Sequence, residues 1–370
     1  MKEDSNLSFV PRVLKLSETR VWRTYTGGAG IDRWRGRSQQ TDGPFPEDWV
    51  ASVVRAKNPG REDVVEGYSR VLNLPGQPYL KDVLEQAPEM YFGHSHLKHV
   101  GSTMGMLIKL IDAHERLTIQ THPDKEFARK FFHSEYGKTE SWYILETRMV
   151  GDQDPCIYFG FKPGVTKERW KSVFETQDIP AMLDCLHKIP VRAGDAFFIP
   201  GGLPHAIGAG CFLAEVQEPT DYTMRTELVT PGGLHIHENQ CHQGVGYENM
   251  LDCFHYDGAN EEETCRRWKV SPNVEEDTEG VRVESYIDSR YTDLFRVRRV
   301  QLSAMWKVPD QTQLQVWVVL KGSGRICTSI EETEIQQGDF LLLPAALSQV
   351  TVVPEENGLE LLSCHPPKAE

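Results

Sequence analysis

Residues 194–205 read GDAFFIPGGLPH, and residues 338–349 read GDFLLLPAALSQ. Both segments begin with Gly-Asp, continue with a short apolar run and reach a proline at the same offset. An apolar run between such turn residues is typical of a β-strand. The repeat therefore predicts two related β units. His205 ends the first segment and Gln349 ends the second, so we expect a metal site in the first unit only.

Further short apolar runs bounded by glycine or proline extend this pattern on both sides of the first segment. They lie at residues 105–111, 141–145, 156–161 and 212–216. Runs of this kind predict a mainly β barrel or sandwich. Helical patterns are fewer and are expected as satellites of the β core. They cover residues 79–87, 124–132, 166–176 and 179–187.

The segment 256–290 divides the chain. It is rich in acidic residues and poor in large apolar ones, which predicts a loop region or linker with a solvated surface. Apolar runs resume after it and continue to residue 361. We therefore expect a first unit at 1–255, the acidic segment at 256–290 and a second barrel at 291–370.

The composition of the chain argues against some kinds of binding partner. The chain has 370 residues and a formal net charge of −14, which argues against a nucleic-acid partner because phosphate backbones call for clustered Lys and Arg. No apolar run is long enough for a membrane span, and residues 1–8 lack the layout of a signal peptide. The eight cysteines form no Cys-x-x-Cys pair, which favours reduced thiols over disulfides or a thiolate metal site. A cytoplasmic protein is expected.

Metal-ligand side chains lie on strand-like segments at suitable spacing. Because side chains alternate along a strand, Gln120 and His122 face one way, and so do Lys138 and Glu140. His205 supplies a further imidazole. A set of imidazole, carboxylate and amide without thiolate suits one zinc ion or a similar divalent ion. The other histidine groups, at 94–99 and 235–237, have no carboxylate or Cys placed to complete a shell, so we expect structural or surface roles for them.

These motifs resemble known families. The hairpin 194–205 is similar to the second sequence motif of the cupins, which are small β-barrels with a metal in the barrel mouth. Within the cupins, residues 107–124 and 137–140 resemble the type I mannose-6-phosphate isomerases, particularly their shorter bacterial form. The match is close from about residue 105 to 225. It implies two cupin-type jelly-roll barrels, with a few short helices packed on the first and no metal ligands in the second.

The resemblance also implies roles for named residues. Its zinc ligands correspond to Gln120, His122, Glu140 and His205, the same set that strand parity selects. The positions that line the family's sugar site correspond to Lys138, Glu215, Asp221 and Arg225. Larger members also carry a phosphate-associated Lys six residues after the Arg, whereas this chain has Pro231 there. A free aldose, or a phosphate held by different cations, therefore stays open.

The implied reaction interconverts mannose 6-phosphate and fructose 6-phosphate through an enediol. Such a reaction needs a Lewis acid beside the reacting oxygens and a group that moves a proton. Glu215 and Lys138 are the leading candidates for proton transfer, with Asp221 as a helper. Which residue is the base stays open, and the alternative role for Glu215 is to hold a metal ligand in place. Arg225 is expected to act electrostatically, because arginine stays charged.

Three alternatives to this function stay open. The first is an isomerase of a free or different sugar. The second is a cupin of another class such as an iron oxygenase, which the Gln-containing ligand set disfavours. The third is a sugar-binding cupin that holds a metal without catalysis.

Overall fold

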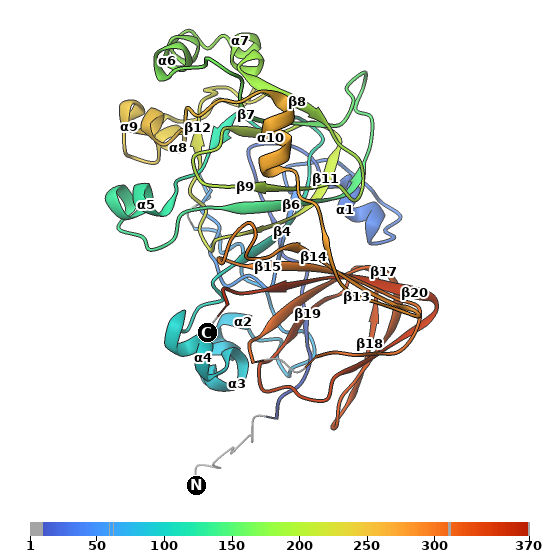
Figure 1. The fold of residues 1–370 in the computed structure, drawn as a ribbon. Helices are drawn as coiled ribbons and strands as arrows, with labels where there is room; N and C mark the ends of the chain where they lie inside the picture. The colour runs from blue at the N-terminus through green and yellow to red at the C-terminus, as the bar shows by residue number, and fades with distance from the viewer. Residues whose placement is uncertain (1–9, 59, 62, 310–311, 369–370) are drawn as a thin grey trace.

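Two β-barrels stacked on each other make up the computed structural model, which describes residues 10–58, 60–61, 63–309 and 312–368 (Figure 1). The first barrel has two sheets. The six-stranded sheet has the order β2-β3-β4-β11-β6-β9 and the five-stranded sheet the order β12-β5-β10-β7-β8. Their bounds are β2 Arg20–Val21, β3 Glu47–Val50, β4 Leu107–Asp112, β5 Gln120–Thr121, β6 Glu140–Thr147, β7 Cys156–Phe161, β8 Leu186–Pro190, β9 Ala196–Ile199, β10 His205–Ile207, β11 Cys211–Gln217 and β12 Met224–Arg225.

The second barrel is a single sheet of nine strands with the order β1-β19-β17-β20-β15-β14-β13, in which β16 pairs with β20 and β18 with β17. Its strands are β1 Leu14–Leu16, β13 Asn273–Thr278, β14 Val281–Ile287, β15 Arg296–Leu302, β16 Trp306–Lys307, β17 Gln315–Cys327, β18 Glu332–Gln336, β19 Phe340–Leu343 and β20 Thr351–His365. The predicted mainly β architecture with two barrels is confirmed.

Short helices lie at the periphery. They are α1 Ala29–Trp34, α2 Leu80–Gln86, α3 Pro88–Phe92, α4 His94–His99, α5 Lys125–Phe132, α6 Lys167–Glu175, α7 Ile179–Asp184, α8 Glu238–His242, α9 Tyr247–Asp252 and α10 Glu261–Trp268. Helix α5 begins where the Asp124 side chain accepts a hydrogen bond from the Phe127 amide at 2.8 Å, and α6 begins with Thr166 in the same role. Both starts match the prediction because Asp and Thr satisfy the free amides of a first turn.

The repeated hairpin has the same backbone in both barrels. Gly194 and Gly338 have φ of 90° and 93°, a region that favours glycine. The next residue, an aspartate in both copies, accepts a hydrogen bond from the amide three residues earlier, at 3.1 Å for Asp195 and 3.0 Å for Asp339. The strands that follow are β9 and β19. The sequence repeat is therefore a structural repeat.

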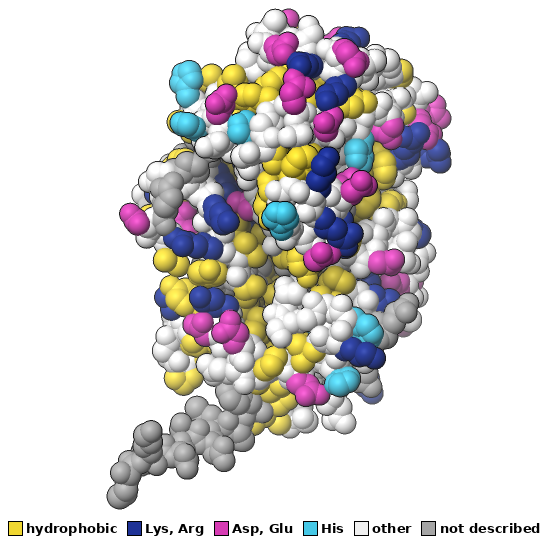
Figure 2. All heavy atoms as spheres, turned by 90° about the vertical axis from the view of Figure 1, so that its left-hand side faces the viewer, with side chains coloured by type: hydrophobic (Ala, Val, Ile, Leu, Met, Phe, Trp, Pro, Cys, Tyr) yellow, Lys and Arg dark blue, Asp and Glu magenta, His cyan; other side chains and the backbone are white. Residues whose placement is uncertain are grey.

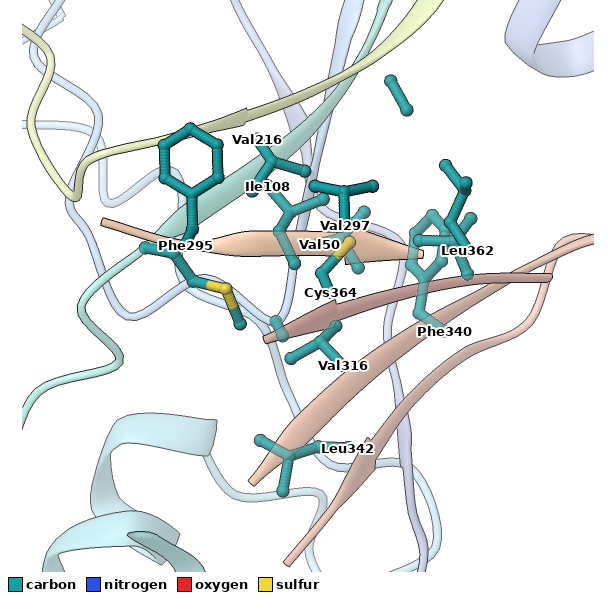
Figure 3. Close-up of a cluster of buried hydrophobic side chains, with 14 of the residues drawn as sticks. Val50, Ile108, Val216, Phe295, Val297, Val316, Phe340, Leu342, Leu362 and Cys364 are labelled. Atoms are coloured by element: carbon teal, nitrogen blue, oxygen red, sulfur yellow. The ribbon is translucent and has the colours of Figure 1, made fainter. Parts of the chain in front are cut away.

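An apolar layer joins the two barrels. Figure 3 shows Val50, Ile108 and Val216, from β3, β4 and β11, against side chains of the second barrel such as Val316 and Leu362. All belong to one buried cluster. Separate clusters fill the inside of the first and the second barrel. The outer face of the six-stranded sheet is therefore apolar where it meets the second barrel, and hydrophobic burial holds the barrels together.

Parts of the predicted organisation are wrong. The segment 256–290 is not a loop region, because it contains all of α10, β13 and β14. Strand β13 pairs with β14, and β14 pairs with β15. Its acidic residues mark a strand at the edge of a sheet, where five of the six β13 residues are exposed. Long-range pairing, which the local composition does not reveal, makes this strand.

Two other elements differ from expectation. The helix expected at 179–187 ends at Asp184, because β8 begins at Leu186 and pairs with β7. The first strand β1 falls inside the unit predicted at 1–255, yet it pairs with β19 of the second barrel. Helix α3 also contacts that barrel, since the amides of Ala345 and Ala346 donate to its carbonyls. The helices are therefore not all packed on the first barrel, and the division at 255 and 290 stays a prediction.

The surface carries charges of both signs. On the face drawn in Figure 2, Lys and Arg side chains are interspersed with Asp and Glu, and apolar side chains lie between them. Among the described residues, no helix is long and apolar enough to cross a membrane.

Candidate metal and sugar site

The four predicted metal ligands come together at one end of the first barrel. His205 opens β10 and lies directly opposite Gln120 of β5. His122 follows β5, and Glu140 begins β6 in the facing sheet. The ligand atoms of His122, Glu140 and His205 lie within 4.8 Å of one another. This is the only such group of His, Cys, Asp and Glu found in the described parts of the chain.

Backbone carbonyls orient both imidazoles. Nδ1 of His122 lies 2.8 Å from the carbonyl oxygen of Tyr222, and Nδ1 of His205 lies 2.9 Å from that of Leu203. A carbonyl oxygen only accepts, so each Nδ1 carries the proton and each Nε2 has a lone pair that can accept a hydrogen bond or bind a metal. The two Nε2 atoms face Glu140, at 3.1 Å for His122 and 3.5 Å for His205. Histidine ligands of metals are commonly held in this way.

The donor set fits a divalent cation. Glu140 and both histidines are at most 1% exposed, and Oε1 of Glu140 is buried without a hydrogen-bond partner. The Gln120 amide lies beside His205, with Nε2 of each 3.4 Å apart. A half-turn of that amide presents its oxygen instead. Two imidazoles, one carboxylate and one amide suit a zinc-like ion.

Lys138 contacts two of the proposed metal-ligand residues, Glu140 and His122. Its Nζ lies 2.6 Å from Oε2 of Glu140 and 2.7 Å from Nε2 of His122. An ion bound at about 2.0–2.2 Å from these atoms needs the place that the ammonium occupies. The Lys138 side chain also lines the adjoining cavity.

That cavity brings together every residue predicted to line the sugar site. Its wall includes Lys138, Glu215, Asp221 and Arg225, and also Gln120. It shares Arg23, Tyr25 and Arg116 with a wider outer cavity of about 680 Å³. The metal cluster therefore adjoins a charged pocket, to which it is connected through Gln120 and Lys138.

A buried network of charges, which the sequence alone did not indicate, holds the carboxylates of the pocket. Lys109 Nζ lies 3.2 Å from Oε1 of Glu215 and 3.8 Å from Oδ1 of Asp221. Arg23 makes two hydrogen bonds to Asp221, at 3.1 and 3.2 Å, and its Nε lies 2.9 Å from Glu47. The one signal in the sequence was Lys109 itself, a lysine in the otherwise apolar strand β4.

The network shifts the pKa values of its carboxyl groups in opposite directions. Burial raises the pKa of Glu215 above its usual value, and the nearby Glu140 raises it further. Burial acts in the same direction on Asp221, but Arg23 and Lys109 outweigh it and hold the pKa of Asp221 well below its usual value. Asp221 is therefore a fixed anion, whereas Glu215 is the carboxyl better suited to exchange a proton.

Two further predicted features have clear positions. Pro231 lines both cavities. Arg225 of β12 donates to the carbonyl oxygen of Gln240 at 2.9 Å, and it makes no ion pair with any of the residues described. Burial lowers the pKa of its guanidinium. Among the cations of the pocket wall, Arg225 is thus the one whose charge is not already matched by a carboxylate.

The remaining histidine groups do not form a second metal centre within the described residues. His96 is fully buried in α4, stacks on Phe92 and bonds to the carbonyl oxygen of Thr103 at 2.8 Å. His237 caps α8, and His235 is exposed. These positions agree with the predicted structural and surface roles.

Comparisons with known proteins agree with this geometry. The family model described as "Phosphomannose isomerase type I, catalytic domain" matches residues 46–145. The "Probable mannose-6-phosphate isomerase GmuF" of Bacillus subtilis (strain 168) is 29% identical over 303 residues, which cover 81% of this chain and 86% of that protein. The "Mannose-6-phosphate isomerase" of Streptococcus mutans is 27% identical over 279 residues, covering 75% and 79% respectively.

A solved structure shares the whole fold. The crystal structure of the mannose 6-phosphate isomerase from Bacillus subtilis superimposes with a TM-score of 0.73 at 20% sequence identity, and covers 95% of this chain and 99% of that chain. The matched family model includes Gln120, His122 and Glu140. The predicted resemblance is confirmed: in sequence and in fold, this chain is similar to the type I phosphomannose isomerases.

Proposed function

We propose that this isomerase interconverts mannose 6-phosphate and fructose 6-phosphate through an enediol. One observation carries the proposal: a cluster of buried metal-ligand atoms is in contact with Lys138, which lines a pocket together with Glu215, Asp221 and Arg225. The names of the relatives point to the same substrate. We also propose that the protein is cytoplasmic, as expected from its sequence.

Gln120, His122, Glu140 and His205 would hold the metal, and we propose one zinc ion per chain. Zinc suits these ligands and is redox-inert, which agrees with a reaction that has no net electron transfer. When bound, it supplies Lewis-acid stabilisation of the negative charge on the substrate oxygens. The carbonyls of Tyr222 and Leu203 support this role, because they fix both imidazoles with Nε2 towards Glu140.

Glu215 and Lys138 are the proposed proton-transfer residues. Trp142 donates to Oε2 of Glu215 at 3.2 Å, and Lys109 lies beside Oε1, so the carboxyl has a fixed orientation. Lys138 lies between the ligand cluster and the cavity. Asp221 helps by anchoring Lys109 and Arg23. The assignment rests on placement, because a general acid or base must reach the reacting carbon.

Arg225 is the proposed electrostatic partner of the substrate. It has no carboxylate partner among the described residues and reaches the pocket, so it stabilises either the enediolate or an anionic group of the sugar. Pro231 stands where larger family members have a lysine, and it lines the same pocket. The absence of this lysine favours one alternative function, the isomerisation of a free or different sugar.

The test is ketose formation by zinc-loaded protein, with mannose 6-phosphate and free mannose supplied separately. We expect turnover of the phosphorylated sugar and at least about a hundredfold loss in the His122→Ala variant. Turnover of free mannose alone would support the alternative function. Binding of mannose 6-phosphate without turnover, with zinc bound, would instead indicate a non-catalytic sugar-binding cupin.

A further inference from the structure

The second barrel has a cavity at the polar end of its interior. Along β15, Val300 and Leu302 belong to the apolar cluster inside the barrel, whereas Arg296 and Arg298, on the same face, line the cavity. Strand β20 changes at the same level, from Leu361 to Ser363 and His365. The neighbouring strands β15 and β20 therefore change from apolar to polar residues at the same level.

The first barrel has the same design. On β6, Ile144 and Trp142 lie in the apolar interior, and Glu140, next on that face, belongs to the metal cluster. On β11, Leu213 is interior and Glu215 lines the sugar pocket. The second barrel lacks a metal cluster among its described residues, yet it keeps a polar mouth of about 340 Å³, a size typical of small-molecule sites.

Uncharged polar groups form the floor of this cavity. His365 is 4% exposed, and its Nε2 lies 3.0 Å from Oγ of Ser363. Ser363 donates to Oε1 of Gln315 at 3.0 Å, and Trp317 donates to the same oxygen at 2.8 Å. Burial, together with Arg296 and Arg298, holds the pKa of His365 well below its usual value. The floor is therefore neutral and can donate and accept hydrogen bonds.

The cavity wall carries charges of both signs, from Glu275, Glu276, Arg296, Arg298 and Lys368. Arg298 pairs with Glu275 at 2.8 Å, and Glu276 accepts a hydrogen bond from the Trp306 indole at 3.3 Å. Arg296 makes no ion pair within the described parts of the chain. Its Nη2 donates to Gln313 at 3.2 Å, and its Nε is buried with no hydrogen-bond partner. A buried donor without a partner is costly, so this guanidinium is suited to an anion.

An aromatic wall completes the cavity. Trp306 lines it and stacks on Trp317 with ring centroids 6.2 Å apart and an interplanar angle of 30°. An indole offers an apolar face and a polar edge, which suits the carbon face of a sugar ring. We propose that the mouth of the second barrel binds a small phosphorylated sugar, with its phosphate on Arg296 and its ring against Trp306. This site is separate from the metal-containing pocket and does not depend on the proposed isomerase activity.

The experiment follows the indole N–H signals of selectively ¹⁵N-tryptophan-labelled full-length protein during titration with glucose 6-phosphate. The chain has eight tryptophans, and the Trp306→Phe variant assigns the signal of interest. We expect the Trp306 signal to shift saturably with glucose 6-phosphate. In Arg296→Met, the titration midpoint should rise at least about tenfold, the loss of one charge-assisted contact, and Arg296→Lys should lie between the two.

The matched control is Arg325→Met, which removes an exposed arginine from β17 of the same barrel and should leave the midpoint unchanged. The other seven indole signals report whether each variant is folded. Inorganic phosphate should shift the Trp306 signal more weakly than glucose 6-phosphate. The proposal is overturned by a Trp306 signal that does not move, by a midpoint that Arg296→Met leaves unchanged, or by an equal response to unphosphorylated glucose.

Discussion

At the scale of single residues, metal binding depends on a small number of side chains, so each one should matter. His205 contributes one of two imidazoles, and the carbonyl oxygen of Leu203 fixes its orientation. We expect His205→Ala to lower zinc affinity at least about tenfold, because even the loss of a supporting group around a metal costs that much. Metal content per chain after dialysis against a weak chelator measures this. His235→Ala removes an exposed histidine and should retain full zinc content; equal retention by His205→Ala would contradict the assignment.

Lys109 provides a second test at this scale. The residue is 3% exposed, and its ammonium lies between Glu215 and Asp221. Lys109→Met should lower the free energy of unfolding by about 3–5 kcal/mol, because it leaves buried carboxylates without their cation. Chemical denaturation measures the loss.

The matched control for Lys109 is a double variant. Adding Glu215→Gln removes one of the uncompensated charges and should restore part of the stability. A loss below about 1 kcal/mol in Lys109→Met, or a double variant whose losses simply add, would show that the network does not hold these carboxylates.

Some residues of the site could be predicted from the sequence, and others could not. His122, Glu140 and His205 were predictable because strand alternation and a hairpin motif are local signals. Arg23 and Glu47 were not, because they reach the pocket from β-strands and loops far away in the sequence and carry no motif of their own. Which distant charges meet in a pocket is decided by packing.

At the scale of elements, the repeated hairpin makes a quantitative prediction. Gly338 has φ of 93°, and a Cβ there would meet only the Arg35 side chain, at ordinary contact distance. Gly338→Ala should therefore cost about 1–2 kcal/mol of stability through backbone strain alone. Thermal or urea unfolding measures the loss.

The control for Gly338 is Gly43→Ala. Gly43 does not have positive φ, and a Cβ there would meet nothing within 4 Å. This substitution should be neutral or slightly stabilising. Equal effects of the two substitutions would contradict the role assigned to the turn.

Elements with local signals were found, and those made by distant pairing were not. Helix α5 was predicted because the helical pattern follows Pro123, and β9 because Gly-Asp and Pro bound its apolar run. Strand β13 reads as a polar linker because it lies at a sheet edge and is mostly exposed. It is a strand because β14 supplies its partners.

At the scale of the whole molecule, buried neutral histidines connect stability to pH. His365 has its pKa held well below the usual value by burial and by Arg296 and Arg298. Below about pH 6.5 the unfolded chain binds a proton there that the folded chain does not. The stability from this residue is therefore present above that pH and decreases as the pH falls, by about 1.4 kcal/mol per unit.

Urea unfolding of wild type and His365→Gln at pH 7 and pH 5 measures this linkage. The variant should lose less stability between the two pH values than the wild type. His235→Gln, at an exposed position, should behave like the wild type. An unchanged pH dependence in His365→Gln would show that His365 is protonated in the folded protein.

The arrangement of the two barrels was only partly predictable. The repeat of residues 194–205 at 338–349 indicated two units. It did not indicate that β1 joins the second barrel or that Ile108 and Val216 lie between the barrels. Strands that are apolar on both faces fit a buried strand of any sheet, so their position in the molecule comes only from the fold.

The central claim is that a metal held by Gln120, His122, Glu140 and His205 makes this chain a mannose-6-phosphate isomerase. The most direct test removes metal with a chelator, restores zinc in steps, and measures bound zinc and fructose 6-phosphate formation in each sample. Activity should rise in proportion to bound zinc and level off at one ion per chain. Full activity without metal, or no activity at full occupancy, would contradict the claim.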